Sequence, residues 1–445
     1  MAANTKLSLF PFTMIVVSLV IGMGIFRTAT DSAAYALTPT IFFAAWIAGG
    51  IIALCGALTY AEIGSRLPVT GGYYKVFAYA YHPSIAFAIN CIILISNAAS
   101  LAIVAIIGAS YLQAGLLPTS GEAVKNGIAI VAILIFYGVN LLGLQLSARM
   151  QTVLMVFKIG MILLMIGALF MPSIHTISPP VILTGSTFSD VLLSFGAAMV
   201  AVSFTYGGYQ QTINFGNDVA NPQRNVPRGI VIGIILIIVL YLLVNLSYYK
   251  VMGFGWLHNR PEAKQIGTEM ARKMMGDTGA QVFSCLLFVC VLAYVNALLL
   301  SNPRVMSAMS TDGVLPKIFA RQTPKTKVLF SALTAFTAVC ILVIFFSSTV
   351  DRLLSFTIFL DCMGMVTSAG AIFVLRKKTK HLDATNIYKV KPYPLIPILF
   401  IVAYTLVAVS IFITKTKLSL IAIAVLVAFV GIYYISQFFS KRVAS

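Results

Sequence analysis

The feature of this sequence that most constrains its fold is a succession of apolar runs, each long enough to cross a lipid bilayer. A helix needs about 20 apolar residues to cross the hydrocarbon core, and such runs recur along the whole chain. Hydrophobic residues make up 60% of the sequence and charged residues only 9%, whereas soluble domains carry roughly 25% charged residues. We therefore expect an all-α integral membrane protein, and we exclude secreted factors, cytosolic enzymes and disordered scaffolds.

The apolar runs predict twelve transmembrane helices in a single membrane domain that covers residues 1–445. No polar linker or change in composition divides the chain. The first run is not followed by a small-residue cleavage site, so we expect it to be retained. The predicted spans cover about 7–36, 39–65, 84–116, 124–147, 150–171, 188–216, 226–252, 277–301, 327–347, 351–375, 393–414 and 416–440.

The distribution of lysine and arginine predicts the orientation of these spans. The formal net charge is +18, which in a soluble protein would indicate a nucleic-acid partner. Here nineteen cationic residues fall on the side of the N-terminus and nine on the opposite side. Because cytoplasmic loops are enriched in lysine and arginine, we expect both termini to be cytoplasmic and the protein to lie in the cell membrane. We expect no nucleic-acid partner.

Several chemistries lack the residues that they require. The six cysteines lie inside apolar runs and form no CxxC pair, so neither a disulfide framework nor a zinc site is indicated. The four histidines fall at predicted loops without metal-binding spacing, and the sequence contains no GxxxxGK[ST] loop for ATP. No loop repeats as a channel filter would. We expect no metal, no cofactor, no enzymatic activity and no channel.

Two of the predicted spans are interrupted in a matching way. The first contains Gly22, Met23 and Gly24, and the sixth, five spans later, contains glycines and polar residues over 206–211. Interrupted helices in corresponding positions of two five-helix halves are typical of inverted-repeat secondary transporters. Backbone groups freed at membrane depth must line a cavity or bind a ligand. We therefore expect the substrate site at these breaks.

The chemistry of the two breaks matches an α-amino acid. The half-helix that starts after Gly24 presents free N–H groups and a positive dipole end, which attract a carboxylate. Carbonyl groups freed around Phe204 to Gly207 can accept hydrogen bonds from an ammonium group. In the alternative interpretation, the glycines of both breaks only allow close packing of helices. That alternative leaves the neighbouring polar residues unexplained.

Motifs spread from residue 20 to about 400 carry a family resemblance. The string GMGIF at 22–26 resembles the G-S/T-G-I-F signature of the amino acid, polyamine and organocation transporter superfamily. The strings FTYGGYQ at 204–210 and NPQRNVPR at 221–228 resemble a motif pair of its L-type amino acid transporter branch. YAEIGSRLP at 60–68, before GGYY, resembles the loop after the second helix, and SNPR at 301–304 resembles the exit of helix 8.

The resemblance implies a LeuT-like fold. Ten core helices over about 7–376 would form two inverted five-helix repeats with discontinuous helices 1 and 6, and two peripheral helices would cover about 393–440. Members that need a heavy-chain partner attach it through a disulfide in the second outer loop. Residues 116–124 contain no cysteine, so no disulfide-linked heavy chain is indicated.

The resemblance also implies the residues of the substrate site. The N–H groups of Met23 and Gly24 would bind the carboxylate, and carbonyl groups of Val20, Phe204 and Gly207 the amine, with Phe204 as the gate. Met23 replaces a small hydroxyl residue of the family, which narrows the pocket and favours small substrates. The predicted substrate-binding set is Val20, Ile21, Gly22, Met23, Gly24, Ile25, Phe204, Thr205, Tyr206 and Gly207.

Two ionisable residues inside predicted spans are candidates for coupling, because charges at membrane depth are costly. In family members with a lysine at the position of Lys158, the ammonium takes the place of sodium and ties helix 5 to helix 1; alternatively Lys158 extends to the cytoplasmic surface. Asp361 can bind a cationic group of the substrate, carry a proton, or pair with Lys158 or Arg27. We favour the pair.

Two asparagines complete the candidate site. Asn97 and Asn296 either reach the pocket or form interhelical hydrogen bonds. Together these features predict a secondary active transporter, either an exchanger or a proton symporter, of small or medium neutral L-amino acids that works by alternating access. The alternative is a cationic amino acid or polyamine transporter that uses Asp361.

Overall fold

The computed structural model describes residues 6–22, 24–26, 28–117, 119–170, 187–259, 266–345, 350–384 and 387–444. Within these ranges all regular elements are helical, apart from isolated bridges that join Leu7 to Val219 and Thr70 to Phe215. The prediction of an all-α protein is confirmed. Nine of the described helices are long and apolar enough to cross a membrane, and three shorter described helices are also apolar.

The helices follow the apolar runs closely, and two predicted spans appear as separate pieces. Short 3-10 turns η1 (Gly24–Phe26) and η3 (Tyr209–Asn214) accompany the broken segments. The α-helices are α1 (Leu9–Val20), α2 (Thr28–Tyr35), α3 (Pro39–Arg66), α4 (Gly72–Ala80), α5 (Pro83–Leu116), α6 (Glu122–Leu141), α7 (Leu144–Gly167), α8 (Phe188–Thr205), α9 (Pro222–Met252), α10 (Phe254–His258), α11 (Ile266–Thr311), α12 (Phe330–Phe345), α13 (Val350–Lys378), α14 (Leu395–Thr414) and α15 (Thr416–Ala444).

Helix α11 departs most from its predicted span of 277–301. It begins at Ile266, kinks at Gly276, where φ is 71°, and continues to Thr311. Its first turns carry Glu269 and Arg272, which form an ion pair and interrupt the apolar run. Hydropathy detects the part of a helix that suits hydrocarbon, whereas backbone hydrogen bonding continues into polar sequence.

The C-terminal end of α1 lies inside the helical bundle. All residues of α1 from Phe12 to Val20 are buried, and the helix packs against α7 and α9. Gly229 and Gly233 of α9 permit this approach, since a Cβ at Gly233 would lie 2.8 Å from Cγ1 of Val16. Small residues four apart let two helix backbones come close. The break that follows α1 is therefore enclosed by protein rather than by lipid.

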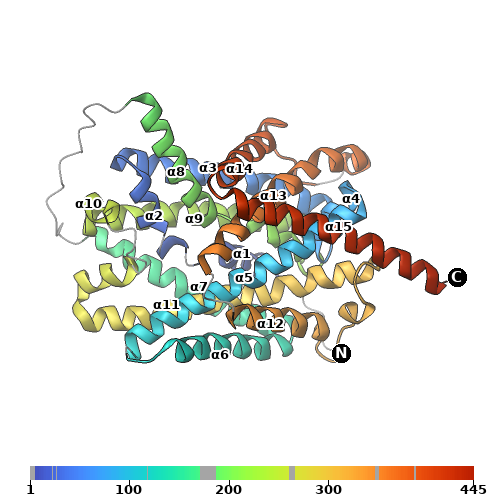
Figure 1. Ribbon diagram of the computed structural model, residues 1–445, viewed down its shortest axis with the longest axis horizontal. Helices are drawn as coiled ribbons and strands as arrows, with labels where there is room; N and C mark the ends of the chain where they lie inside the picture. The colour runs from blue at the N-terminus through green and yellow to red at the C-terminus, as the bar shows by residue number, and fades with distance from the viewer. Residues whose placement is uncertain are drawn as a thin grey trace.

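Other helices form the outer layer of the bundle. Figure 1 shows α6 along the lower edge with α12 beside it, and α15 across the outer surface. Helix α5 packs against α11 in the interior and against α15 on the outside. Exposed leucines, isoleucines and valines recur on α6, α14 and α15, as expected for surfaces that face lipid.

A buried ionic cluster joins one end of α3 to α13. The side chain of Glu62 is fully buried and accepts hydrogen bonds from Arg66 Nε at 2.7 Å and Arg376 Nη2 at 2.7 Å. The backbone N–H of Val390 donates to Oε2 of Glu62 at 2.8 Å. The guanidinium of Arg376 also lies 3.5 Å from the ring centroid of Tyr393. This carboxylate thus fixes three segments that are distant in sequence.

Candidate functional site

The chain leaves the helical path at both predicted breaks. Helix α1 ends at Val20 and Ile21 has ψ of 83°, after which the chain resumes as η1 and α2. Helix α8 ends at Thr205, and Gly208 adopts a left-handed conformation with φ of 111° before η3. Only glycine adopts such a φ freely. Each break frees backbone groups inside the bundle.

The two breaks lie against each other. A Cβ at Gly208 would overlap the carbonyl oxygen of Leu19 and lie 3.5 Å from Cα of Val20. A Cβ at Gly24 would lie 2.8 Å from Cγ2 of Thr205. Close packing is therefore one role of these two glycines. Gly22 differs, because its Cβ would meet only the ring of Tyr294, at an ordinary 3.7 Å.

A cavity of about 230 Å³ lies beside both breaks. Its lining includes seven residues of the predicted site, namely Val20, Gly22, Gly24, Asn97, Thr205, Gly207 and Asp361. The lining also carries hydroxyl groups from α5 and α11, where Ser100 and Tyr294 are hydrogen-bonded at 2.8 Å. The cavity is thus lined by residues of both breaks and by polar side chains of two other helices.

Three described residues of the predicted substrate-binding set lie outside the cavity lining. The carbonyl of Ile21 accepts a hydrogen bond from Lys158, and that of Ile25 accepts one from Tyr248 at 3.4 Å. Tyr206 packs its ring on Trp46 and donates to the carbonyl of Trp46 at 3.3 Å. These contacts shape the breaks rather than the cavity wall.

Three predicted residues fall outside what the structure describes. Met23 and Arg27 lie outside the described residues, and so does the side chain of Phe204. The roles predicted for Met23 and for Phe204 as a gate therefore stay predictions.

Lys158 is buried and holds the end of α1. Its side chain, from the middle of α7, is only 1% exposed, and Nζ donates a hydrogen bond of 2.6 Å to the carbonyl of Ile21. That carbonyl lies where α1 ends and has lost its helical partner. The alternative in which Lys158 extends to the surface is wrong. Lys158 does not line the cavity, so it can act on the site only through the backbone of the break.

Asp361 lines the cavity without a cation nearby. The hydroxyl of Ser96 on α5 donates to its carboxylate at 3.1 Å, and the described residues provide no ion pair for it. The preferred prediction, a pair with Lys158, is therefore wrong, because Lys158 donates instead to the carbonyl of Ile21 at the end of α1. The pair with Arg27 concerns a residue outside the described part of the chain.

The two asparagines have different environments. Asn97 lines the cavity and connects two elements, donating to Asn302 at 2.7 Å and accepting from Gln211 at 2.8 Å. Asn296 instead donates to Gln151 Oε1 at 2.6 Å and accepts from Asn140 at 2.8 Å, away from the cavity lining. Asn296 thus joins three helices by hydrogen bonds.

Sequence reasoning placed Gln211 in the sixth break but did not assign it to the site. Its side chain lines the cavity and is 6% exposed, and Oε1 has no hydrogen-bond partner in the described structure. A buried acceptor of this kind requires a donor from water or a ligand. The signal available in the sequence was the presence of two glutamines at membrane depth beside Gly208.

Comparisons with known proteins identify the family of this chain. The family model described as "Amino acid permease" matches residues 7–435. The serine/threonine exchanger SteT of Bacillus subtilis (strain 168) is 28% identical over 435 residues, which cover 96% of this chain and 95% of that protein. The methylthioribose transporter of the same organism is 29% identical over 421 residues, which cover 88% of this chain and 85% of that protein.

A mammalian relative extends the comparison. The large neutral amino acids transporter small subunit 2 of Mus musculus is 24% identical over 457 residues, covering 99% of this chain and 82% of that protein. The chain is therefore similar to the family model and to this relative along nearly its whole length, and not only at the motifs that resemble the superfamily and its L-type branch. The chain belongs to the amino acid permease family of multi-pass membrane transporters, within the amino acid, polyamine and organocation superfamily, and has L-type relatives.

Proposed function

We propose that this amino acid transporter is a secondary active carrier of small or medium neutral L-amino acids, working as an exchanger or a proton symporter. The observation that carries the proposal is that two broken segments, distant in sequence, face one cavity of about 230 Å³. A zwitterion needs donors for its carboxylate and acceptors for its ammonium group. Free backbone groups at broken helices provide both inside a membrane.

The lining residues suggest the orientation of the substrate. The backbone N–H of Gly24, at the start of η1, would donate to the carboxylate, and the carbonyls of Val20 and Gly207 would accept from the amine. The carbonyl of Val20 already accepts from Gly22 N at 2.8 Å and from the hydroxyl of Tyr241 at 3.4 Å, so a substrate amine would replace the longer of these two contacts. The side chain of the substrate would then point toward Asp361 and the wall from α5.

We further propose a LeuT-like arrangement of twelve spans in a single domain over 1–445. The core would cover about 7–376, and α14 and α15 would be the peripheral helices. The broken segments α1–η1 and α8–η3 would be equivalent elements of two inverted five-helix repeats. With both termini cytoplasmic, the protein would be a multi-pass component of the cell membrane.

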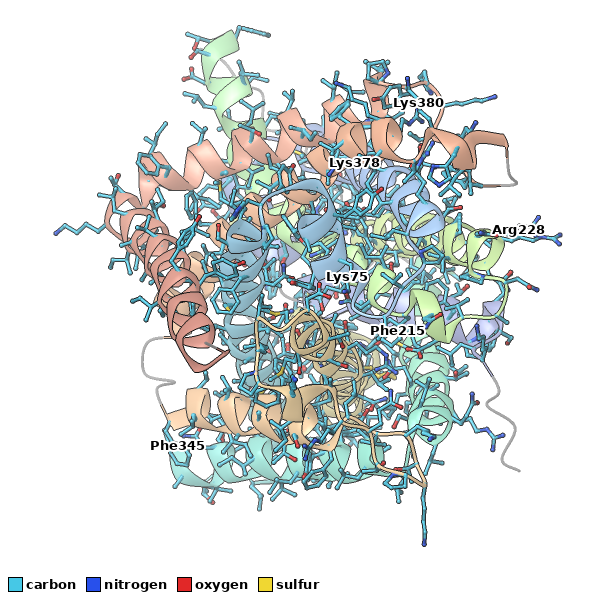
Figure 2. The ribbon with its side chains drawn as sticks, turned by 90° about the vertical axis from the view of Figure 1, so that its right-hand side faces the viewer. Lys75, Phe215, Arg228, Phe345, Lys378 and Lys380 are labelled. Carbon is cyan, nitrogen blue, oxygen red and sulfur yellow. The ribbon has the colours of Figure 1, made fainter. Side chains whose placement is uncertain are left out.

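The ion pairs support alternating access. Two ion pairs lie at the end predicted to be cytoplasmic. Arg304 of α11 pairs with Asp218, at the end of the sixth segment, at 2.6 Å. Lys75 of α4 pairs with Asp312, which follows the end of α11. Figure 2 views this end of the bundle, with Lys75 labelled near its centre. At the opposite end, the ion pairs among the described residues join only residues close in sequence. This pattern fits a conformation closed toward the cytoplasm.

A cationic amino acid or polyamine is a second candidate substrate, favoured by one observation. Asp361 lines the cavity and no cation lies within ion-pair distance among the described residues. A cationic side chain would satisfy this carboxylate, whereas a neutral substrate leaves it to a proton or to hydroxyl donors such as Ser96.

Mode and partners are also proposed. The similarity to a serine/threonine exchanger supports exchange. Because residues 116–124 contain no cysteine, we propose that this chain works without a disulfide-linked heavy chain. It would act as a carrier rather than an enzyme, with no cofactor.

The test is transport by the purified full chain in proteoliposomes. Vesicles loaded with L-alanine or L-serine should accumulate the labelled amino acid by counterflow, and an imposed pH gradient distinguishes exchange from symport. Unlabelled L-lysine and putrescine are added as competitors. Stronger competition by these cations than by L-alanine would replace the neutral substrate class by the cationic one. Absence of any amino acid counterflow would refute the proposal.

A further inference from the structure

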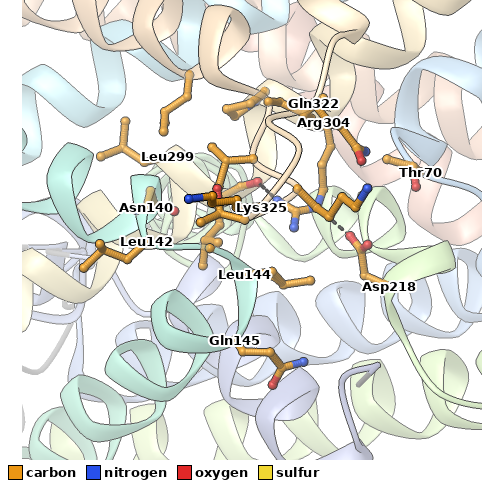
Figure 3. A pocket seen from close by; sticks show the side chains of 18 of the residues that line it. Thr70, Asn140, Leu142, Leu144, Gln145, Asp218, Leu299, Arg304, Gln322 and Lys325 are labelled. Atoms are coloured by element: carbon orange, nitrogen blue, oxygen red, sulfur yellow. Dashed lines mark hydrogen bonds and ion pairs between the residues drawn. The ribbon is translucent and has the colours of Figure 1, made fainter. Parts of the chain in front are cut away.

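A second cavity, of about 940 Å³, opens at the end of the bundle that is predicted to be cytoplasmic (Figure 3). It lies where the end of α6 and the start of α7 meet α11 and the segment 322–329 before α12. It has no lining residue in common with the cavity at the helix breaks. The two cavities are therefore distinct.

Positive charge dominates this cavity. Arg304, Lys325 and Lys327 line it, against a single carboxylate from Asp218. Arg304 donates to that carboxylate at 2.6 Å, so these two charges compensate each other. The ammonium groups of Lys325 and Lys327 have no partner in the part of the chain that the structure describes. Two uncompensated cations thus remain in the cavity.

The segment that carries both lysines is a hydrogen-bonded turn. Thr323 N donates to Val328 O at 2.8 Å, Val328 N donates to Thr323 Oγ1 at 3.0 Å, and Lys327 N donates to Thr323 O at 3.1 Å. Lys327 has φ of 55°, a left-handed conformation that disfavours most side chains. The turn therefore fixes the backbone of both lysines, whose side chains are exposed, and Figure 3 shows Lys325 among the lining residues.

The rest of the lining combines polar side chains, such as those of Asn140 and Gln322, with a group of leucines. Leu142, Leu144, Leu329 and Leu333 form this group. Leu142 is 62% exposed, and the neighbouring Phe330 is 47% exposed. Figure 1 places α6 and α12 at the edge of the bundle. A ligand in this cavity meets the ammonium groups of Lys325 and Lys327 and the exposed side chain of Leu142.

We propose that this cavity binds the phosphate headgroup of an anionic phospholipid from the cytoplasmic leaflet. Lys325 and Lys327 pair with the phosphate, and an acyl chain passes along the exposed Leu142 into the bilayer. Basic pockets between membrane helices on the cytoplasmic side are suited to anionic headgroups. Free phosphate has the same charge chemistry, but it leaves the leucines without an apolar partner.

The test compares two double variants of the full chain in detergent. Lys325→Gln with Lys327→Gln removes the cavity cations, whereas the control Lys317→Gln with Lys377→Gln removes two exposed lysines that are predicted on the same face and lie outside the lining. Short-chain phosphatidylglycerol and phosphatidylcholine are titrated, with native mass spectrometry and thermal unfolding as readouts. Each cavity lysine should contribute about fivefold to the phosphatidylglycerol affinity, and both together about 30-fold.

The outcomes separate the possible sources of binding. A selective loss of phosphatidylglycerol binding in the cavity variant, with amino acid binding retained, supports the proposal and shows that the variant is folded. Equal loss in both double variants would mean unspecific surface attraction and would overturn it. Inorganic phosphate that competes fully at matched concentration would assign the cavity to a free anion instead. A changed substrate KM without any change in lipid binding would assign it to the substrate pathway.

Discussion

Replacing Lys158 by methionine tests whether a side chain outside the cavity controls the substrate site. Methionine keeps much of the length of the side chain but removes the ammonium that donates to Ile21 O at 2.6 Å. A hydrogen bond from a charged donor contributes about 1.5–3 kcal/mol, which corresponds to about 10- to 150-fold in an equilibrium constant. Because Ile21 directly precedes Gly22 of the cavity lining, substrate affinity should fall by a factor in this range.

The chain offers a matched control for this bond. Lys250 of α9 also donates to a backbone carbonyl, that of Leu169, at 2.6 Å, but it lies outside the cavity lining and away from the breaks. Lys250→Met should therefore lower thermal stability with little effect on affinity. Equilibrium binding of labelled amino acid to the detergent-purified variants measures both effects.

Transport adds a second readout for Lys158→Met. If Lys158 carries a coupling proton, uptake into proteoliposomes should lose its response to an imposed pH gradient, while some binding survives. An unchanged response would leave Lys158 a positioning residue. Wild-type affinity in Lys158→Met, or an equal loss in Lys250→Met, would refute the argument that this bond sets the geometry of the break.

Three further variants test separate parts of the structure. Gly22→Ala should abolish amino acid binding without unfolding, since its Cβ has room but occupies the cavity edge; Gly160→Ala, with open space around it, is the control for binding and thermal stability. Asp361→Asn should spare alanine transport and alter its pH profile if a proton neutralises the acid, whereas loss of lysine transport alone would show a cationic substrate. Glu62→Gln removes the carboxylate charge that Arg66 and Arg376 contact, and should lower the free energy of unfolding by about 3–5 kcal/mol. The exposed Glu122→Gln is the control and should lower it by less than about 1 kcal/mol. Equal decreases in the two variants would contradict the role of the buried cluster.

The sequence by itself determined the class of the protein and the positions of its breaks. Both follow from local properties of the chain. Apolar runs specify helices in a membrane because each backbone group must find its partner within the same segment. Gly22, Gly24, Gly207 and Gly208 weaken the local preference for a continuous helix. The breaks could therefore be predicted without knowing which segments pack against them. Family motifs at the same positions then indicated the substrate chemistry.

Only the tertiary structure decided which side chains meet. Asp361 bonds Ser96 rather than Lys158, Asn97 faces the cavity while Asn296 does not, and Gln211 keeps a free acceptor. These outcomes depend on the rotation of each helix about its axis. In soluble proteins an amphipathic stripe fixes that rotation, but helices that are apolar on all sides carry no such stripe. Their rotation is set by close packing, as at Gly208 against Leu19, and hydropathy does not record it.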